Sequence, residues 1–452
     1  MCRPLQGMGG RLQTARGGGL IRLAAGRRVA CFAAPNGWLR KSAKRRDFRL
    51  FLPKRGGGAF ANAPPLDFFR EKIYDDRVLK RQGFRPKRAQ AGRMTEETPM
   101  KNFLSEKAKN IAPYAAGEQP KDKKYVKLNT NENPYPPSPK ALEAYKNFDF
   151  SSLNLYPAPD ADALRAAVAE AEGVLPENVF CGNGSDEILA LCLPAFFDEG
   201  GEGAAFADIT YSFYPVFCNF FGVKYTLLPL EADFSLDLDK LSAMPAQGLI
   251  VANPNAPTGI GIPLAEIERF VRENSGRVVI IDEAYMPFFN ESAVPLIKKY
   301  KNLLVVKTFS KGYSLAGMRC GYAVGDVSLI EGLFRCKDCF NSYPLDRVCQ
   351  AVCAAAISDG AYYAEKNALV ISERERLTEA LRGRGFEVLP SKSNFVFARH
   401  ERLAGKEVYE GLRARGVLVR HFQKPRIENF CRITIGSRAQ NDALLKALDE
   451  ML

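Results

Sequence analysis

Histidine and tryptophan are scarce in this chain. Its 452 residues contain two histidines, His400 and His421, and a single tryptophan. A mechanism that depends on histidine for acid–base chemistry or for metal binding therefore has only two candidate side chains. Long apolar runs are missing as well, and none approaches the ~20 residues that a helix needs to cross a bilayer. The sequence therefore predicts no contact with a membrane.

Acidic residues are scarce only at the beginning of the chain. Residues 1–99 contain 23 of the 64 Lys and Arg but 7 of the 51 Asp and Glu, which leaves 41 basic and 44 acidic side chains in residues 100–452. The formal net charge of +13 therefore arises from residues 1–99 alone. The rest of the chain lacks the positive charge that nucleic-acid-binding proteins carry. We expect no nucleic-acid partner for it.

The basic segment 1–99 is rich in Arg and Gly, and three interpretations are open. It has the composition of a transit peptide, or it is upstream sequence translated because the start was placed too early. It could also bind nucleic acid by itself, which salt-dependent binding of that fragment would reveal. Met94 and Met100 precede the change in composition, and we favour the second interpretation. We expect residues 1–99 to be a disordered or mis-started extension outside the fold.

The eleven cysteines show no paired framework of the kind that secreted proteins use for disulfides. This usage predicts a reducing compartment, and we expect a cytoplasmic protein. Cys336, Cys339, Cys349 and Cys353 do form a C-x2-C, x9, C-x3-C pattern that a zinc site could use. Valine and alanine surround the second pair, however, and free cysteine packs in buried helices as a small apolar residue. We expect no metal site.

Polar residues follow three successive apolar runs in the middle of the chain. Asn253, Asp282 and Lys311 lie just past these runs and are spaced 29 residues apart. Such spacing is typical of strand–helix–strand units in a parallel sheet, in which ligands bind beyond the carboxyl ends of the strands. Burial there lowers the pKa of a lysine and makes it a nucleophile for a carbonyl group. An aspartate buried there needs a cation to offset its charge.

Two further segments suit a ligand site. Residues 179–191 read as a strand, the turn GNGSDE and a helix, and such a turn offers backbone N–H groups to an anion; the alternative is a merely capped helix. The proline-rich stretch 128–139 forms neither a regular helix nor a central strand, so it is expected to cross a surface as an ordered arm.

The expected architecture is α/β with two domains. Residues 150–345 would form a large domain around a parallel sheet. After Pro344 the pattern becomes helical with two late strands, which indicates a smaller α+β domain over residues 346–452. Residues 100–149 would supply the arm and part of the small domain.

A nucleophilic lysine, a buried aspartate, an aromatic run at residues 211–214 and an anion-binding helix start together suit pyridoxal phosphate. At these positions the sequence resembles the fold-type I pyridoxal-phosphate-dependent aminotransferases, and within them the histidinol-phosphate aminotransferases, over about residues 100–452. The resemblance implies a large domain with a mostly parallel seven-stranded sheet, a smaller α+β domain and a homodimer. It also implies amino transfer between L-glutamate and imidazole acetol phosphate, in histidine biosynthesis.

The resemblance assigns roles around the cofactor. Lys311 would bond to the cofactor aldehyde and shuttle the substrate proton, and Asp282 would pair with the pyridinium nitrogen. Tyr285 would hydrogen-bond the ring hydroxyl, and Tyr211 would stack on the ring. The residues implied at the cofactor phosphate are Gly184, Ser185, Asp186, Thr308, Ser310 and Arg319.

Five more positions match residues beyond the cofactor ring. Tyr156 matches a tyrosine that reaches the phosphate from the neighbouring subunit. Arg432 matches the arginine that takes the α-carboxylate of glutamate, and Arg420 matches one associated with the substrate phosphate. Asn133 and Asn394 would line the substrate side.

One position departs from the family pattern, and two related activities remain open. The family often has asparagine directly before Pro-Thr-Gly, where this chain has Ala256 with Asn255 one residue earlier. Asn255 would contact the ring hydroxyl only after a local backbone adjustment. The open activities are threonine-phosphate decarboxylation and aromatic amino-acid transamination on the same fold. A non-catalytic regulator of this fold is disfavoured by the intact Lys311, Asp282 and Arg432.

Overall fold

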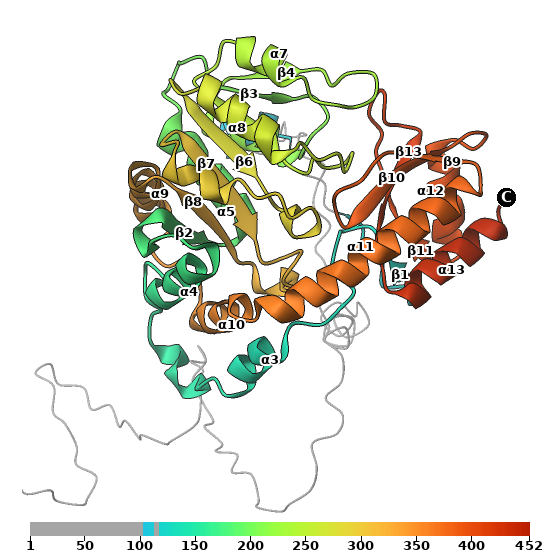
Figure 1. Ribbon diagram of the computed structural model, residues 1–452, viewed down its shortest axis with the longest axis horizontal. Coiled ribbons are helices and arrows are strands. Elements are labelled where there is room, and N and C mark those ends of the chain that lie inside the picture. The colour runs from blue at the N-terminus through green and yellow to red at the C-terminus, as the bar shows by residue number, and fades with distance from the viewer. Residues whose placement is uncertain (1–102, 113–116) are drawn as a thin grey trace, which may run out of the picture. The chain divides into compact units, whose positions relative to one another are not determined.

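The computed structural model describes residues 103–112 and 117–452 of the chain, all within the unit Met100–Leu452. Its centre is a seven-stranded sheet with the spatial order β2-β8-β7-β6-β5-β3-β4 (Figure 1). All neighbours pair in parallel except β8, which is antiparallel to both β2 and β7. The strands are β2 (Val179–Gly182), β3 (Ala204–Ala207), β4 (Tyr225–Leu228), β5 (Gly248–Ala252), β6 (Val278–Asp282), β7 (Leu303–Thr308) and β8 (Gly321–Gly325). The predicted mostly parallel seven-stranded sheet is confirmed.

Successive side chains of a strand point to opposite faces of the sheet. Because the strands are apolar throughout, both faces of this sheet pack into a core and are buried. On β7, Leu303 and Val305 pack in one core cluster, whereas Leu304 and Val306 pack in the other. The first cluster includes helices α4 (Asp162–Glu172), α7 (Leu238–Ala243), α8 (Leu264–Glu273) and α10 (Arg347–Ile357). The second includes α5 (Gly184–Phe196), α6 (Phe213–Phe221) and α9 (Val327–Phe340).

A smaller α+β region follows, as the fold class predicted. Its antiparallel sheet has the order β12-β13-β10-β9, and it packs with α12 and α13 (Figure 1). The proline-rich arm begins at β1, which pairs in parallel with β11 and thereby joins this region. The elements are β1 (Val126–Lys127), β9 (Phe386–Val388), β10 (Phe395–His400), α12 (Gly405–Ala414), β11 (Val417–Leu418), β12 (Arg420–His421), β13 (Phe430–Thr434) and α13 (Arg438–Asp449).

The long helix α11 (Gly360–Arg382) connects the two regions (Figure 1). Tyr363 near its start packs in the core of the large sheet, whereas Val370 and Leu377 pack in the core of the smaller region. Helix α10 also packs against the large sheet through Cys349 and Val352. The expected boundary at residues 345/346 stays a prediction, since α10 lies beyond it in sequence but shares the core of the large region.

Short elements complete the described chain. They are α2 (Glu106–Asn110), α3 (Pro139–Lys146) and the 3-10 helices η2 (Phe150–Asn154), η3 (Pro176–Asn178), η4 (Met286–Phe288), η5 (Val294–Lys298) and η6 (Ala316–Met318). Among the residues that the structure describes, no helix has the length and apolarity that a bilayer span requires. The expectations for residues 1–99 lie outside the described residues.

Candidate active site

Asp282 and Lys311, two of the polar residues at the strand ends, line one cavity of about 260 Å³, whereas Asn253 bonds to Ile262 instead. Strands β6 and β7 are neighbours in parallel register, so Asp282 at the end of β6 and Lys311 just beyond β7 approach the same edge of the sheet. Eleven residues expected from the sequence line this cavity: Ser185, Asp186, Tyr211, Asp282, Tyr285, Thr308, Ser310, Lys311, Arg319, Arg420 and Arg432. Their individual roles remain predictions.

Asp282 is a buried carboxylate held by two donors. Its side chain accepts hydrogen bonds from the Tyr214 hydroxyl at 2.7 Å and from the Ala284 backbone N–H at 3.1 Å. Burial raises its pKa to about 6, while these two hydrogen bonds oppose the rise. The group is therefore ionised at neutral pH, and it lines the cavity as a negative charge with little water around it. Such a charge suits a cationic ring nitrogen.

Lys311 is the amine of the cavity. Its Nζ donates to the Thr130 carbonyl at 3.2 Å and lies 5.9 Å from the ring centre of Tyr285. Burial lowers its pKa to about 8, and the positive charge of Arg432 acts in the same direction. A substantial fraction of the amine is therefore neutral near pH 8, which is the form that attacks a carbonyl carbon.

The first turn of α5 and Arg319 form a cradle for an anion. The N-cap residue Asn183 makes no side-chain cap hydrogen bond, and the positive end of the helix dipole lies at this turn. Gly184 has φ +78°, and a Cβ at that position would come within 2.9 Å of the Arg319 guanidinium. Asp186 accepts from Tyr211 at 2.6 Å and pairs with Arg319 at 3.2 Å. Glycine thus lets the guanidinium approach the helix start.

Arg420 and Arg432 lie directly opposite each other on the antiparallel strands β12 and β13. Like charges at facing positions of a sheet disfavour its pairing. Both side chains line the cavity, so an anion bound there would relieve the repulsion. The antiparallel register of β12 and β13 thus brings both arginines to one cavity.

Four expected residues do not line the cavity. Asn133 donates to the Lys311 carbonyl at 3.2 Å, and the buried Asn394 donates to the Asn131 carbonyl at 3.0 Å. Gly184 lies at the helix start already described. Tyr156 is 78 % exposed and stacks on Tyr343 with ring centres 4.7 Å apart, so within this chain it points to the surface.

Asn255 faces a different small cavity. Its amide donates to the Ile209 carbonyl and to Thr258, and its oxygen accepts from Thr210, each at 2.8–3.0 Å. Ala256, not Asn255, lines the main cavity. The side chain of Asn255 is thus fully engaged away from the site, and the backbone adjustment that its proposed contact needs stays a prediction.

The sequence did not indicate the hydrogen-bond network that holds the Tyr285 hydroxyl. Asn131 donates to the Tyr285 hydroxyl at 2.9 Å, and its own carbonyl side chain accepts from Thr434 at 3.0 Å. The sequence also gives no indication that Tyr214, within the aromatic run, holds Asp282. Asn131 has a positive φ of 56°, a strained conformation that is common at ligand sites. The crowding of asparagines in NTNENP was the available signal for it.

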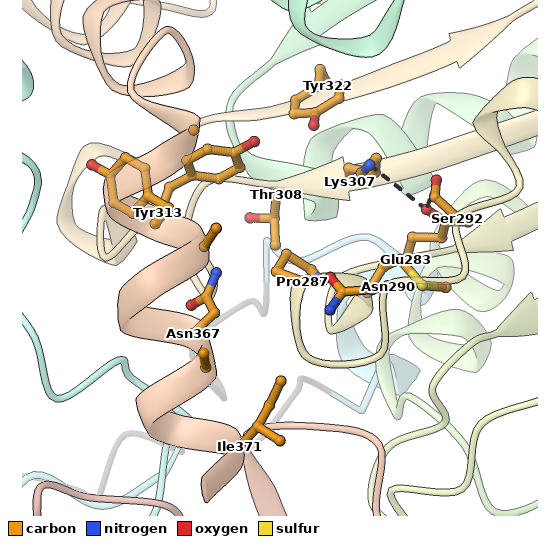
Figure 2. Close-up of a pocket in the computed structure, with 15 residues that line it drawn as sticks. Glu283, Pro287, Asn290, Ser292, Lys307, Thr308, Tyr313, Tyr322, Asn367 and Ile371 are labelled. Atoms are coloured by element: carbon orange, nitrogen blue, oxygen red, sulfur yellow. Dashed lines mark hydrogen bonds and ion pairs between the residues drawn. The ribbon is translucent and has the colours of Figure 1, made fainter.

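Figure 2 shows a second cavity of about 360 Å³, and Thr308 lines both this cavity and the first. Lys307 on its wall pairs with Glu172 at 2.8 Å and with Glu283 at 3.8 Å. These partners outweigh burial and raise the pKa of Lys307. The ion pairs hold the carboxyl ends of β6 and β7 together, next to Asp282 and Thr308 of the first cavity.

Comparison with known proteins places this geometry in a family. Residues 123–448 match the family described as Aminotransferase class I and II. A histidinol-phosphate aminotransferase of Syntrophus aciditrophicus is 48% identical over 354 residues, covering 77% of this chain and 98% of that protein. Histidinol-phosphate aminotransferase 2 of Thiobacillus denitrificans is 51% identical over 339 residues, covering 75% and 94%.

A solved structure shares the fold. The histidinol-phosphate aminotransferase of Sinorhizobium meliloti in complex with pyridoxal-5'-phosphate has a TM-score of 0.67 at 23% identity, covering 73% of this chain and 92% of that chain. That likeness shows the fold alone, whereas the matches in sequence extend through the strand ends and the cavity residues. The chain therefore belongs to the class I and II aminotransferase family, and within it to the histidinol-phosphate aminotransferases.

Proposed function

We propose that this protein is a pyridoxal-phosphate-dependent transaminase that moves an amino group between L-glutamate and imidazole acetol phosphate. The products would be 2-oxoglutarate and L-histidinol phosphate, as in histidine biosynthesis. The proposal rests on one cavity that contains Lys311, whose pKa is lowered, and the buried, ionised Asp282. Two arginines that face each other on neighbouring strands line the same cavity. The relatives that match nearly all of the described chain carry the same activity in their names.

The residues fit pyridoxal phosphate in three places. Asp282 offers a buried negative charge to a pyridinium nitrogen, and Lys311 offers a partly neutral amine to an aldehyde. Gly184 leaves room beside Arg319 at a helix start, which suits a phosphate. Tyr211 would stack on the ring and Tyr285 would hydrogen-bond its hydroxyl. Ser185, Thr308 and Ser310 would complete the phosphate contacts.

When bound, pyridoxal phosphate supplies an electron sink that stabilises a carbanion at the substrate Cα. Lys311 supplies the proton chemistry, because an amine of pKa about 8 can both take and return a proton near neutral pH. Asp282 keeps the ring nitrogen protonated, and Tyr214 in turn keeps Asp282 oriented by its 2.7 Å hydrogen bond. Burial raises the pKa of Tyr214 well above its usual value, so this hydroxyl remains a donor.

The two arginines would divide the substrates between them. A planar guanidinium binds a carboxylate or a phosphate through two parallel hydrogen bonds. We assign the α-carboxylate of glutamate to Arg432, which already donates to the Asn129 carbonyl at 3.1 Å and borders Lys311. We assign the phosphate of histidinol phosphate to Arg420. Asn133 and Asn394 would line the substrate side of the site with neutral amide groups.

We further propose a homodimer in which Tyr156 completes the partner's site. Tyr156 stacks on Tyr343, and large apolar side chains are exposed in the two segments that carry these tyrosines: Phe150, Leu153, Leu155, Tyr156, Phe340 and Tyr343. Exposed apolar surface of this kind typically marks a protein interface. Arg347 donates to the Tyr156 carbonyl at 3.2 Å and fixes the backbone there. A Tyr156→Phe variant should weaken cofactor binding and leave the oligomeric mass unchanged.

Purified protein should test the activity directly. Incubation with L-histidinol phosphate and 2-oxoglutarate should form glutamate, whereas a threonine-phosphate decarboxylase would release CO2 from its substrate without a keto-acid partner. An aromatic aminotransferase would prefer phenylalanine or tyrosine as donor. The ratio of kcat/KM for histidinol phosphate to that for each competitor decides between the three activities.

A further inference from the structure

Three buried cysteines meet where β8 begins and α10 packs against the large sheet. The sulfur atoms of Cys320, Cys349 and Cys353 all lie within 4.8 Å of one another. Cys320 directly precedes β8, and the other two lie one turn apart on α10. Each of the three side chains is at most 1% exposed. The zinc pattern considered from the sequence does not form this group, because Cys336 and Cys339 lie on α9 and Cys320 takes their place.

The spacing of these sulfurs matches the geometry of a bound ion. A first-row d10 ion sits about 2.3 Å from a thiolate sulfur, so three sulfurs arranged around it in a plane lie about 4.0 Å apart. The observed group needs to contract by less than about 1 Å to reach that spacing. Cysteines at i and i+4 on one helix face already point to the same side.

We propose that Cys320, Cys349 and Cys353 bind a soft d10 metal ion, copper(I) or zinc(II), through three thiolates. Thiolate ligands select such ions over hard ones. The surroundings are apolar, with Leu315 and Leu345 in the same core cluster. A structural zinc site normally has four ligands, whereas three sulfurs form the group among the residues that the structure describes. Copper(I) is therefore the expected occupant. Each sulfur that coordinates as a thiolate releases its proton to solvent, which balances the reaction.

This site would connect the core to the cofactor cradle. Cys320 follows Arg319, and its carbonyl accepts from the Phe309 N–H at 3.0 Å and from Thr308 Oγ1 at 3.4 Å. Without the ion, Cys349 donates from Sγ to the Met318 carbonyl at 3.3 Å, and coordination as a thiolate would replace this hydrogen bond by the metal–sulfur bond. A bound ion would thus tie α10 to the loop that carries Arg319, and the folded protein would become more resistant to unfolding.

Metal binding to the full-length protein tests the proposal. The protein is loaded under anaerobic, reducing conditions by incubation with copper(I) or with zinc(II), and in parallel by expression in copper-supplemented medium. Wild-type protein should hold one copper(I) per chain against a competing chelator, and its midpoint of thermal unfolding should rise. Cys349→Ala and Cys353→Ala should each weaken binding more than tenfold and abolish the rise in Tm.

Two control variants separate this site from other thiols. Cys218 is equally buried but stands outside the group, so Cys218→Ala should bind copper(I) like wild type. The double variant Cys336→Ala/Cys339→Ala should do the same. Tighter binding of zinc(II) than of copper(I), lost in Cys349→Ala, would keep the site and change the ion. The proposal is overturned if neither ion binds, or if the double variant loses binding while Cys353→Ala keeps it.

Discussion

Replacing Lys311 by methionine should make the apoenzyme more stable at neutral pH. Its pKa falls from 10.5 to about 8 in the folded protein, so the charged form is disfavoured by about 3 kcal/mol, at 1.36 kcal/mol for each pH unit. Methionine removes this penalty but also the hydrogen bond to the Thr130 carbonyl, which contributes about 1 kcal/mol. We therefore expect Lys311→Met to raise the free energy of unfolding by about 2 kcal/mol at pH 7.

The pH dependence of this gain in stability distinguishes it from a packing effect, which would be the same at every pH. A lysine whose pKa is depressed on folding destabilises the folded state below pH 8, and the penalty disappears as pH rises from 8 to 10.5. The gain in Lys311→Met should accordingly shrink by about 2 kcal/mol between pH 7 and pH 9.5. Urea unfolding of the cofactor-free proteins measures both values. A gain that is absent, or that is the same at both pH values, would refute the argument that this amine is poised for chemistry.

The remaining predictions concern substrates, the buried charges and the N-terminal segment. Arg420→Ala should lower kcat/KM for histidinol phosphate tenfold to a hundredfold, about 1.5–3 kcal/mol, and spare the glutamate half-reaction that Arg432→Ala impairs; equal losses for Arg420→Ala would make it a structural residue. Tyr214→Phe should raise the pKa of Asp282 and weaken cofactor binding more at pH 6.5 than at pH 8.5, seen in equilibrium titrations. Lys307→Met should destabilise the fold by about 3–5 kcal/mol in urea, because the buried Glu283 and the partly buried Glu172 lose their partner; a neutral result would show that water reaches them. A chain of residues 100–452 should fold and turn over like the full-length protein, and loss of its activity would assign a role to residues 1–99.

The strands and their ends could be predicted because both depend on short, contiguous patterns in the sequence. The apolar runs before Asn253, Asp282 and Lys311 are continuous, as strands buried on both faces require, and their equal spacing indicated parallel pairing. The structure confirms the seven strands and brings Asp282 and Lys311 to one cavity. The facing of Arg420 and Arg432 was also predictable, because a short polar loop separates two apolar runs.

The missed features depend on contacts between distant segments. Asn131 reaches Tyr285 across 154 positions of the chain, and no local pattern indicates which of three neighbouring asparagines does so. The predicted boundary at residues 345/346 stays a prediction, and sequence order alone did not indicate that α10, beyond it, shares the core of the large sheet. The cysteine group likewise joins Cys320 to a helix that begins 27 residues later. The C-x2-C spacing instead indicated Cys336 and Cys339, which do not belong to the group.

Amino transfer from L-histidinol phosphate to 2-oxoglutarate tests the central claim most directly. Purified full-length protein supplied with pyridoxal phosphate should form one glutamate for each histidinol phosphate consumed, and Lys311→Ala should form none. After borohydride reduction, peptide mapping should place the cofactor on Lys311. Consumption of threonine phosphate with release of CO2, or cofactor attached at a different lysine with full activity, would contradict the account.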